Sequence, residues 1–171
     1  MCYDADACNG SWRPTLRALW SPQGQQGRIP TPGQPCKRCG LGAITDQTGE
    51  TVGLCRRRKR RQEVAERLQA LVDKQSTGTL SVAWDHADTH ADDAVGAVVR
   101  AAAGRLVLLD WPTDSPWLHP IARLWRQCRR EVTHGELCAS LDALLKAAHA
   151  FFGRDNQSLE RVFSIIGAHA A

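Results

Sequence analysis

The sequence predicts a single α/β domain in which a mixed β-sheet is flanked by helices, and three observations support this. The chain has 171 residues, of which 43% are hydrophobic and 23% charged, a composition typical of a folded domain. In its second half, short apolar runs alternate with segments of helical periodicity, as in parallel strands joined by helical crossovers. In its first half, a turn containing glycine separates two strand-like runs and predicts an antiparallel hairpin.

The first third of the chain favours strands around a long loop. Residues 1–6 predict the end of a strand, because aromatic and apolar side chains alternate there with acidic ones. Residues 10–35 contain most of the prolines and predict a loop. Residues 39–44 and 51–55 predict the two strands of the hairpin, with the turn at 46–49.

Two apolar strands and two helices are predicted to follow. Residues 59–75 carry one apolar stripe at helical spacing and predict a helix. Residues 80–84 and 106–109 are short apolar runs and predict buried strands. Between these strands, residues 91–103 predict a helix that is closed by Gly104.

Three further helices are predicted after the last strand. Pro120 fits the first turn of the next helix, because the N–H that proline lacks is not needed there. Thr133 and Glu136 have the spacing of a capping box and predict the start of a helix that runs to about Phe152. The last helix is predicted over 159–166. The apolar face of the Pro120 helix consists of Ile121, Leu124, Trp125 and Cys128.

Apolar content and cysteine usage predict the compartment. No apolar run is long enough to span a membrane, and the N-terminus has no secretory signal. We therefore predict a cytoplasmic protein without membrane contact, whose seven cysteines are reduced thiols. Cys36 and Cys39 have the spacing of half a zinc site, but no second pair follows, so thiols on a hairpin are favoured.

The charge distribution suggests a polyanionic partner. The net charge is +4, and the excess of basic side chains lies in the first half of the chain. Such a cluster either contacts the phosphates of DNA or forms an ordinary solvated surface, and the sequence leaves both readings open. The main basic run consists of Arg56, Arg57, Arg58, Lys59, Arg60 and Arg61.

Three segments carry a resemblance to a known family. The stretch 109–125, LDWPTDSPWLHPIARLW, resembles a Pro-Thr-Tyr-Ser-Pro-Trp-Leu-Asn-Pro-Ile-Glu-Arg-Leu-Trp segment of mariner-related bacterial insertion-sequence transposases. The stretch 85–90, DHADTH, is similar to the Asp-Asn-x-x-x-His segment of that family. Asp6, followed by PTLRALWSPQGQ at 14–25, is similar to its first acidic strand and the segment after it. The family has a DDE catalytic domain of the RNase H-like fold, and the resemblance covers residues 1–171.

The resemblance implies a metal site with one member missing. In the family, three carboxylates hold two Mg²⁺ or Mn²⁺ ions, which cut and join DNA by phosphoryl transfer. Asp6 and Asp85 match the first and second acids, although Asp4 is an alternative for the first. The third acid is replaced by Ala122. The histidines expected at the edge of the site are His86, His90 and His119.

The function implied is that of a DNA transposase catalytic domain which is degenerate because of Ala122 and lacks the upstream helix-turn-helix region. Its expected partners are the DNA of the element ends and of the target, together with a second copy or a full-length transposase. Because the three acids are incomplete, the sequence leaves open whether the chain is an enzyme.

The sequence is also compatible with two other functions. One is a non-catalytic remnant that binds DNA or dimerises with a full-length transposase, as the missing acid and the basic run suggest. The other is an unrelated α/β metalloprotein that uses Asp85, His86 and His90 as ligands.

Overall fold

The computed structural model describes most of the chain, and every structural statement below refers to that part. The side chains of Leu54 and Pro116 are not described. The described residues are 1–11, 14, 20–25, 27–31, 37–45, 47–56, 60–85, 93–112, 115–134 and 137–168.

The centre of the fold is a five-stranded sheet with the strand order β3-β2-β1-β4-β5. The central strand β1 pairs with β2 in antiparallel and with β4 in parallel orientation. The outer pairs are antiparallel β2–β3 and parallel β4–β5. The mixed sheet predicted from the sequence is therefore confirmed. The strands are β1 (Cys2–Ser11), β2 (Lys37–Ile44), β3 (Thr51–Arg56), β4 (Leu80–Trp84) and β5 (Leu106–Asp110).

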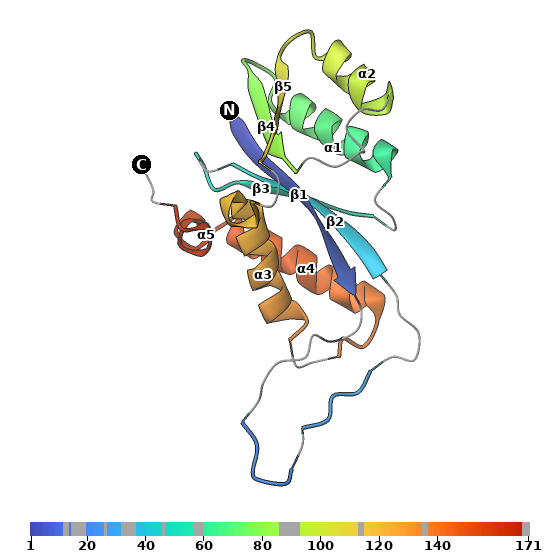
Figure 1. Cartoon of the computed structure of the whole chain (residues 1–171), viewed down its shortest axis with the longest axis vertical. Coiled ribbons are helices and arrows are strands. Elements are labelled where there is room, and N and C mark those ends of the chain that lie inside the picture. Colours follow the sequence, from blue (N-terminus) through green and yellow to red (C-terminus); the bar gives the residue numbers. More distant parts are fainter. Residues whose placement is uncertain are drawn as a thin grey trace.

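Helices cover the two faces of this sheet unequally (Figure 1). One face packs against α1 and α2 in a core that includes Tyr3 of β1. The other face packs against α3, α4 and α5 in a second core that includes Cys8 of β1. Side chains alternate along a strand, so Asp4 and Asp6 share the face of Cys8. The helices are α1 (Arg61–Lys74), α2 (Asp93–Ala101), α3 (Pro120–Val132), α4 (Leu141–Asp155) and α5 (Leu159–Ile166).

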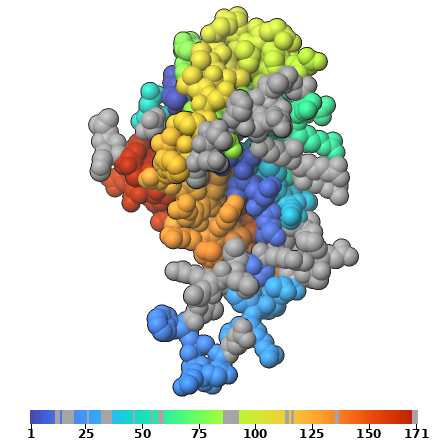
Figure 2. All heavy atoms as spheres, viewed as in Figure 1, coloured from blue at the N-terminus to red at the C-terminus, as the bar shows by residue number. Residues whose placement is uncertain are grey.

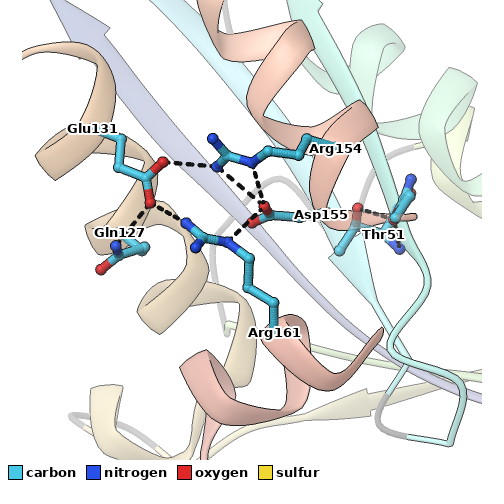
Figure 3. A network of polar contacts seen from close by, with 7 residues as sticks. Thr51, Gln127, Glu131, Arg154, Asp155 and Arg161 are labelled. Atoms are coloured by element: carbon cyan, nitrogen blue, oxygen red, sulfur yellow. Dashed lines mark hydrogen bonds and ion pairs between the residues drawn. The ribbon is translucent and has the colours of Figure 1, made fainter. Parts of the chain in front are cut away.

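A polar network ties α3 to α4 and α5 (Figure 3). Glu131 of α3 accepts a hydrogen bond from Arg154 of α4 at 2.7 Å and another from Arg161 of α5. Both arginines also donate to one oxygen of the fully buried Asp155, at 3.2 and 3.1 Å. Because three helices share these four charges, the far end of α3 is held firmly in place.

Trp125 of α3 lies directly on the backbone of β2. A Cβ atom added at Gly42 would lie 2.5 Å from Cζ2 of this indole, and one at Gly40 would lie 3.0 Å from Cη2. Glycine therefore allows α3 to approach the sheet closely at this point. The apolar face predicted for this helix is confirmed, since all four of its residues are buried.

The last strand differs from its prediction. Residues 106–109 were expected to be buried, but Val107 is 39% and Leu109 45% exposed. The physical reason is position: β5 is the edge strand, whereas α3 packs over β1 and β2 and α4 packs over β3. An apolar run predicts a strand, but it does not say which neighbours will cover it.

The predicted start of the fourth helix is wrong. Thr133 does not open a helix; it follows the end of α3, and its hydroxyl donates to the carbonyl of Arg129 at 2.9 Å. The helix α4 begins instead after Ser140, whose Oγ accepts from the amide of Ala143 at 3.0 Å. Threonine at a helix end can bond back to the preceding turn, so its spacing to Glu136, which lies outside the described residues, is misleading.

The described residues contain no helix that combines the length and the apolar character needed to cross a bilayer.

Candidate active site at β1, β4 and α3

The register of the sheet brings the two predicted acids to neighbouring positions. Ala5 of β1 lies opposite Trp84 of β4, and this is the last pair recorded between the two parallel strands. Asp6 is the next residue of β1, and Asp85 is the first residue after β4, so the two acids follow a pair of strands that lie about 4.8 Å apart. Asp6 is half-buried, whereas Asp85 is exposed.

The two acids are related to the sheet face that α3 covers. Asp6 shares this face with Asp4, which accepts a hydrogen bond from the start of α3. Asp85 is two residues beyond Ala83, which lines the same pocket as Asp4. Alternate residues of a strand share one face, so continuing the alternation of β4 by one residue beyond Trp84 puts Asp85 on the side of Asp6.

Ala122 lies in the first turn of α3, next to a residue that is bonded to β1. Its amide donates to the carbonyl of His119 at 3.2 Å, and its side chain is half-buried. The preceding amide, that of Ile121, donates to Oδ2 of Asp4 at 2.9 Å. Position 122 is therefore held close to Asp4 of β1, which is two residues from Asp6. The methyl group of Ala122 cannot bind a metal ion.

Asp4 holds the start of α3 in place, a role that the sequence did not reveal. Its side chain is only 7% exposed. Besides the amide of Ile121, Oδ1 accepts from Nε1 of Trp111 at 2.8 Å and lies 3.3 Å from Nδ1 of His119. His119 occupies the N-cap position without making a side-chain cap bond. A carboxylate from the sheet thus replaces the usual cap of this helix.

Burial also changes the acidity of this carboxylate. Desolvation raises the pKa of Asp4, while the hydrogen bonds from Ile121 and Trp111 and the nearby His119 lower it and only partly offset that effect. The sequence signal that could have suggested this role is the spacing of Asp4 and Asp6, which places both on one strand face.

The predicted histidines are only partly covered by the structure. His119 is buried and packs edge-on against Trp111, with ring centroids 5.3 Å apart. It therefore lies inside the fold beside Asp4. His86 and His90 lie outside the described residues.

The basic run is only partly described as well. Nη2 of Arg56 forms an ion pair with Glu66 of α1 at 3.0 Å. Arg60 and Arg61 are exposed at the start of α1, on the other side of the sheet from α3. Residues 57–59, which include Arg57 and Arg58, lie outside the described part.

The residues present suit one divalent cation better than two. Carboxylate oxygens are the ligands that Mg²⁺ and Mn²⁺ prefer, so Asp6 and Asp85 fit such an ion. Ala122 offers no donor for a second ion. Within the described ranges, no group of three or more His, Cys, Asp or Glu residues is arranged to hold a metal.

Solved structures with a similar fold include those of the Mos1 transposase. The Mos1 transposase paired-end complex with the left transposon end matches 99% of this chain and 56% of the Mos1 chain, at a TM-score of 0.62 and 13% identity. The Mos1 strand transfer complex matches 97% of this chain and 53% of the Mos1 chain, at a TM-score of 0.63 and 12% identity. A Mos1 mariner paired end complex with Mn also matches, at a TM-score of 0.62 and 13% identity. This match covers 99% of this chain and 56% of the Mos1 chain. The sheet and its helices are thus RNase H-like, as in a transposase catalytic domain.

The family follows from the sequence itself. The DDE superfamily endonuclease family matches residues 2–145, and the chain belongs to it. The insertion element IS630 uncharacterized 39 kDa protein of Shigella sonnei is 29% identical over 141 residues, which are 81% of this chain and 40% of that protein. The chain therefore spans less than half of that relative and little more than half of the Mos1 chains. The resemblance to mariner-related transposases is confirmed, and the alternative of an unrelated metalloprotein is wrong.

Proposed function

We propose that this chain is a degenerate DNA transposase catalytic domain whose carboxylate pair is inherited and whose third acid is lost. The observation that supports the proposal is the register of β1 and β4, whose last pair, Ala5 and Trp84, immediately precedes Asp6 and Asp85. Ala122 lies in the first turn of α3, which packs on β1. Family membership supports the reaction class, which is the cleavage and transfer of DNA strands.

In this proposal Asp6, and not Asp4, is the first acid. Both oxygens of Asp4 are engaged in contacts that hold the fold together, and the side chain is buried. Asp6 lies further along the strand, next to Asp85 and nearer to solvent. In this proposal Asp4 has a structural role at the start of α3, while Asp6 and Asp85 are the ligands of the cation.

A bound Mg²⁺ or Mn²⁺ ion would polarise a phosphate oxygen and stabilise charge that develops on it. Asp6 and Asp85 would each offer an oxygen ligand to such an ion, which typically also binds phosphate and water. The missing carboxylate at position 122 lowers the rate of strand cleavage by at least ~10²–10³, the typical cost of losing one electrostatic stabiliser.

The partners proposed for the whole protein are the DNA of the element ends and of the target. The matched Mos1 structures are paired-end and strand transfer complexes, which supports this class of partner. We propose that a helix-turn-helix region and a second transposase subunit complete the assembly, and that it acts in the cytoplasm.

The test restores the missing acid. Nicking of plasmid DNA in Mn²⁺ is measured for the wild-type chain and for Ala122→Glu, and Mn²⁺ affinity is measured by calorimetry. We expect little or no nicking by the wild type, and at least ~10²-fold faster nicking with tighter Mn²⁺ binding by the variant. The matched control adds Asp85→Asn to Ala122→Glu, which should abolish both gains. A variant that neither nicks DNA nor binds more Mn²⁺ refutes the proposal.

A second candidate function is a non-catalytic module that binds DNA or pairs with a complete transposase. The alanine at position 122 favours it, because binding does not need a third ligand. In that case the Asp85→Asn variant binds DNA as well as the wild type does, and Ala122→Glu gains no nicking activity.

A further inference from the structure

The outer surface of α3 carries a row of arginines that starts beside the candidate active site. Arg126 lies one turn after Ala122, and Arg129 and Arg130 follow one turn later. Residues three and four apart are neighbours on a helix surface, so all of them lie along one side. The three arginines are exposed and are called the α3 arginine row below. Figure 2 shows α3, in gold to orange, at the molecular surface next to β1 in blue.

The charges of this row are not neutralised within the described part of the chain. The guanidinium groups of Arg126 and Arg130 form no hydrogen bond or ion pair with another described residue. The contact recorded for Arg129 is with Sγ of Cys8, at 2.8 Å, which carries no full charge. Glu131 is the one acidic residue in the sequence of α3, and it is bound by two arginines from α4 and α5.

The contact of Arg129 also fixes where the row lies. Cys8 is two residues beyond Asp6 on the same face of β1, so the row runs alongside β1 from the level of the acids. At 1.5 Å per residue, Arg126 lies about 6 Å and Arg130 about 12 Å along the helix from Ala122. Phosphates of one DNA strand follow each other every 3.4 Å along the duplex axis, so the row spans roughly two to three of them.

We propose that the α3 arginine row binds the phosphates of a duplex DNA strand whose path continues from the Asp6–Asp85 pair. The proposal rests on the DNA partner of the proposed function and names the surface that holds it. Arginine suits this task, because its planar guanidinium donates two parallel hydrogen bonds to a phosphate. The first described residue of the basic run, Arg56, is by contrast already paired with Glu66.

The experiment measures how DNA binding depends on salt, without any metal. Fluorescence anisotropy with a labelled duplex of about 30 bp is recorded in EDTA over a series of salt concentrations. Each phosphate contact contributes about 0.9 to the slope of log K against log[salt]. For Arg126→Gln combined with Arg130→Gln we expect the slope to fall by about 2 and the affinity at 0.1 M salt to fall roughly 50-fold.

Two matched variants control for general charge effects. Arg100→Gln removes an exposed arginine from α2, on the other side of the sheet, and should leave the slope within about 0.3 of the wild-type value. Arg60→Gln with Arg61→Gln removes two charges from the start of α1 and should change the slope less than the α3 pair does. Circular dichroism confirms that each variant is folded.

Three outcomes overturn the proposal. The first is that the variant with Arg126→Gln and Arg130→Gln keeps the salt slope of the wild type. The second is that the variant with Arg60→Gln and Arg61→Gln loses more of the slope than the α3 variant does, which would indicate that the basic run binds the DNA. In both cases the proposed function still stands, because it is tested separately by nicking with Ala122→Glu. The third is a wild-type chain that binds no duplex DNA at 50 mM salt, which removes the DNA partner altogether.

Discussion

Removal of the Asp4 carboxylate tests whether a strand residue holds the start of α3. The change Asp4→Ala leaves two donors without an acceptor, the amide of Ile121 and Nε1 of Trp111. An unpaired buried donor costs about 1–3 kcal/mol, so the loss is roughly 2–6 kcal/mol. Removal of the carboxylate also offsets part of this loss in stability, because its desolvation opposes folding and raises the pKa of Asp4. We expect a net loss of about 3 kcal/mol in the free energy of unfolding.

Urea unfolding, followed by tryptophan fluorescence and circular dichroism, measures this loss. About 3 kcal/mol corresponds to a fall of roughly 6–12 °C in the melting temperature of a chain of this size. Asp4→Asn keeps one acceptor oxygen and should lie between the wild type and the alanine variant. The matched control is Asp6→Asn, two residues along the same strand face, for which we expect a change within about 1 kcal/mol. An Asp4→Ala variant that unfolds at the same urea concentration as the wild type would show that this carboxylate does not hold the start of α3.

Two further predictions concern the packing between α3 and the sheet. Gly42→Ala places a Cβ atom 2.5 Å from the ring of Trp125 and should cost about 1–3 kcal/mol, measured by urea unfolding. Gly53→Ala is its control, because nothing lies within 4 Å of a Cβ there; equal effects of the two changes would contradict the packing argument. Burial raises the pKa of Cys128 to about 12, so its reactive thiolate is scarce at pH 8. Mass spectrometry after iodoacetamide treatment should find Cys128 modified only in urea, and modification in the native state as fast as that of the half-buried Cys138 would be inconsistent with a buried thiol.

The sequence predicted those parts of the fold that depend on local pattern. The last helix has the predicted bounds, 159–166, because its apolar periodicity ends at a glycine that adopts a positive φ of 72°. Pro120 is the first residue of α3 for an equally local reason, its fixed backbone conformation. The hairpin and the parallel strands were also predictable, since strand-length runs and their connections are visible in the chain.

Tertiary arrangement accounts for what was missed. The exposure of Val107 and Leu109 depends on which strands the helices cover, and no pattern within β5 carries that information. The role of Asp4 depends on Ile121, 117 residues away in the sequence. The candidate acids were found by resemblance, and the sheet register ends at Ala5 and Trp84, the residues that precede Asp6 and Asp85. Only coordinates distinguish Asp4 as the buried contact of a helix start from Asp6 as its more accessible neighbour.

The absence of side chains at Gly40 and Gly42 has a consequence for protein engineering. The indole of Trp125 lies against main-chain atoms, so the height of α3 above the sheet is set by the backbone of β2 and not by adjustable rotamers. Repacking the surrounding apolar residues should leave that height unchanged. A metal-binding side chain introduced along this helix can therefore be designed on the basis of a fixed distance between α3 and the sheet.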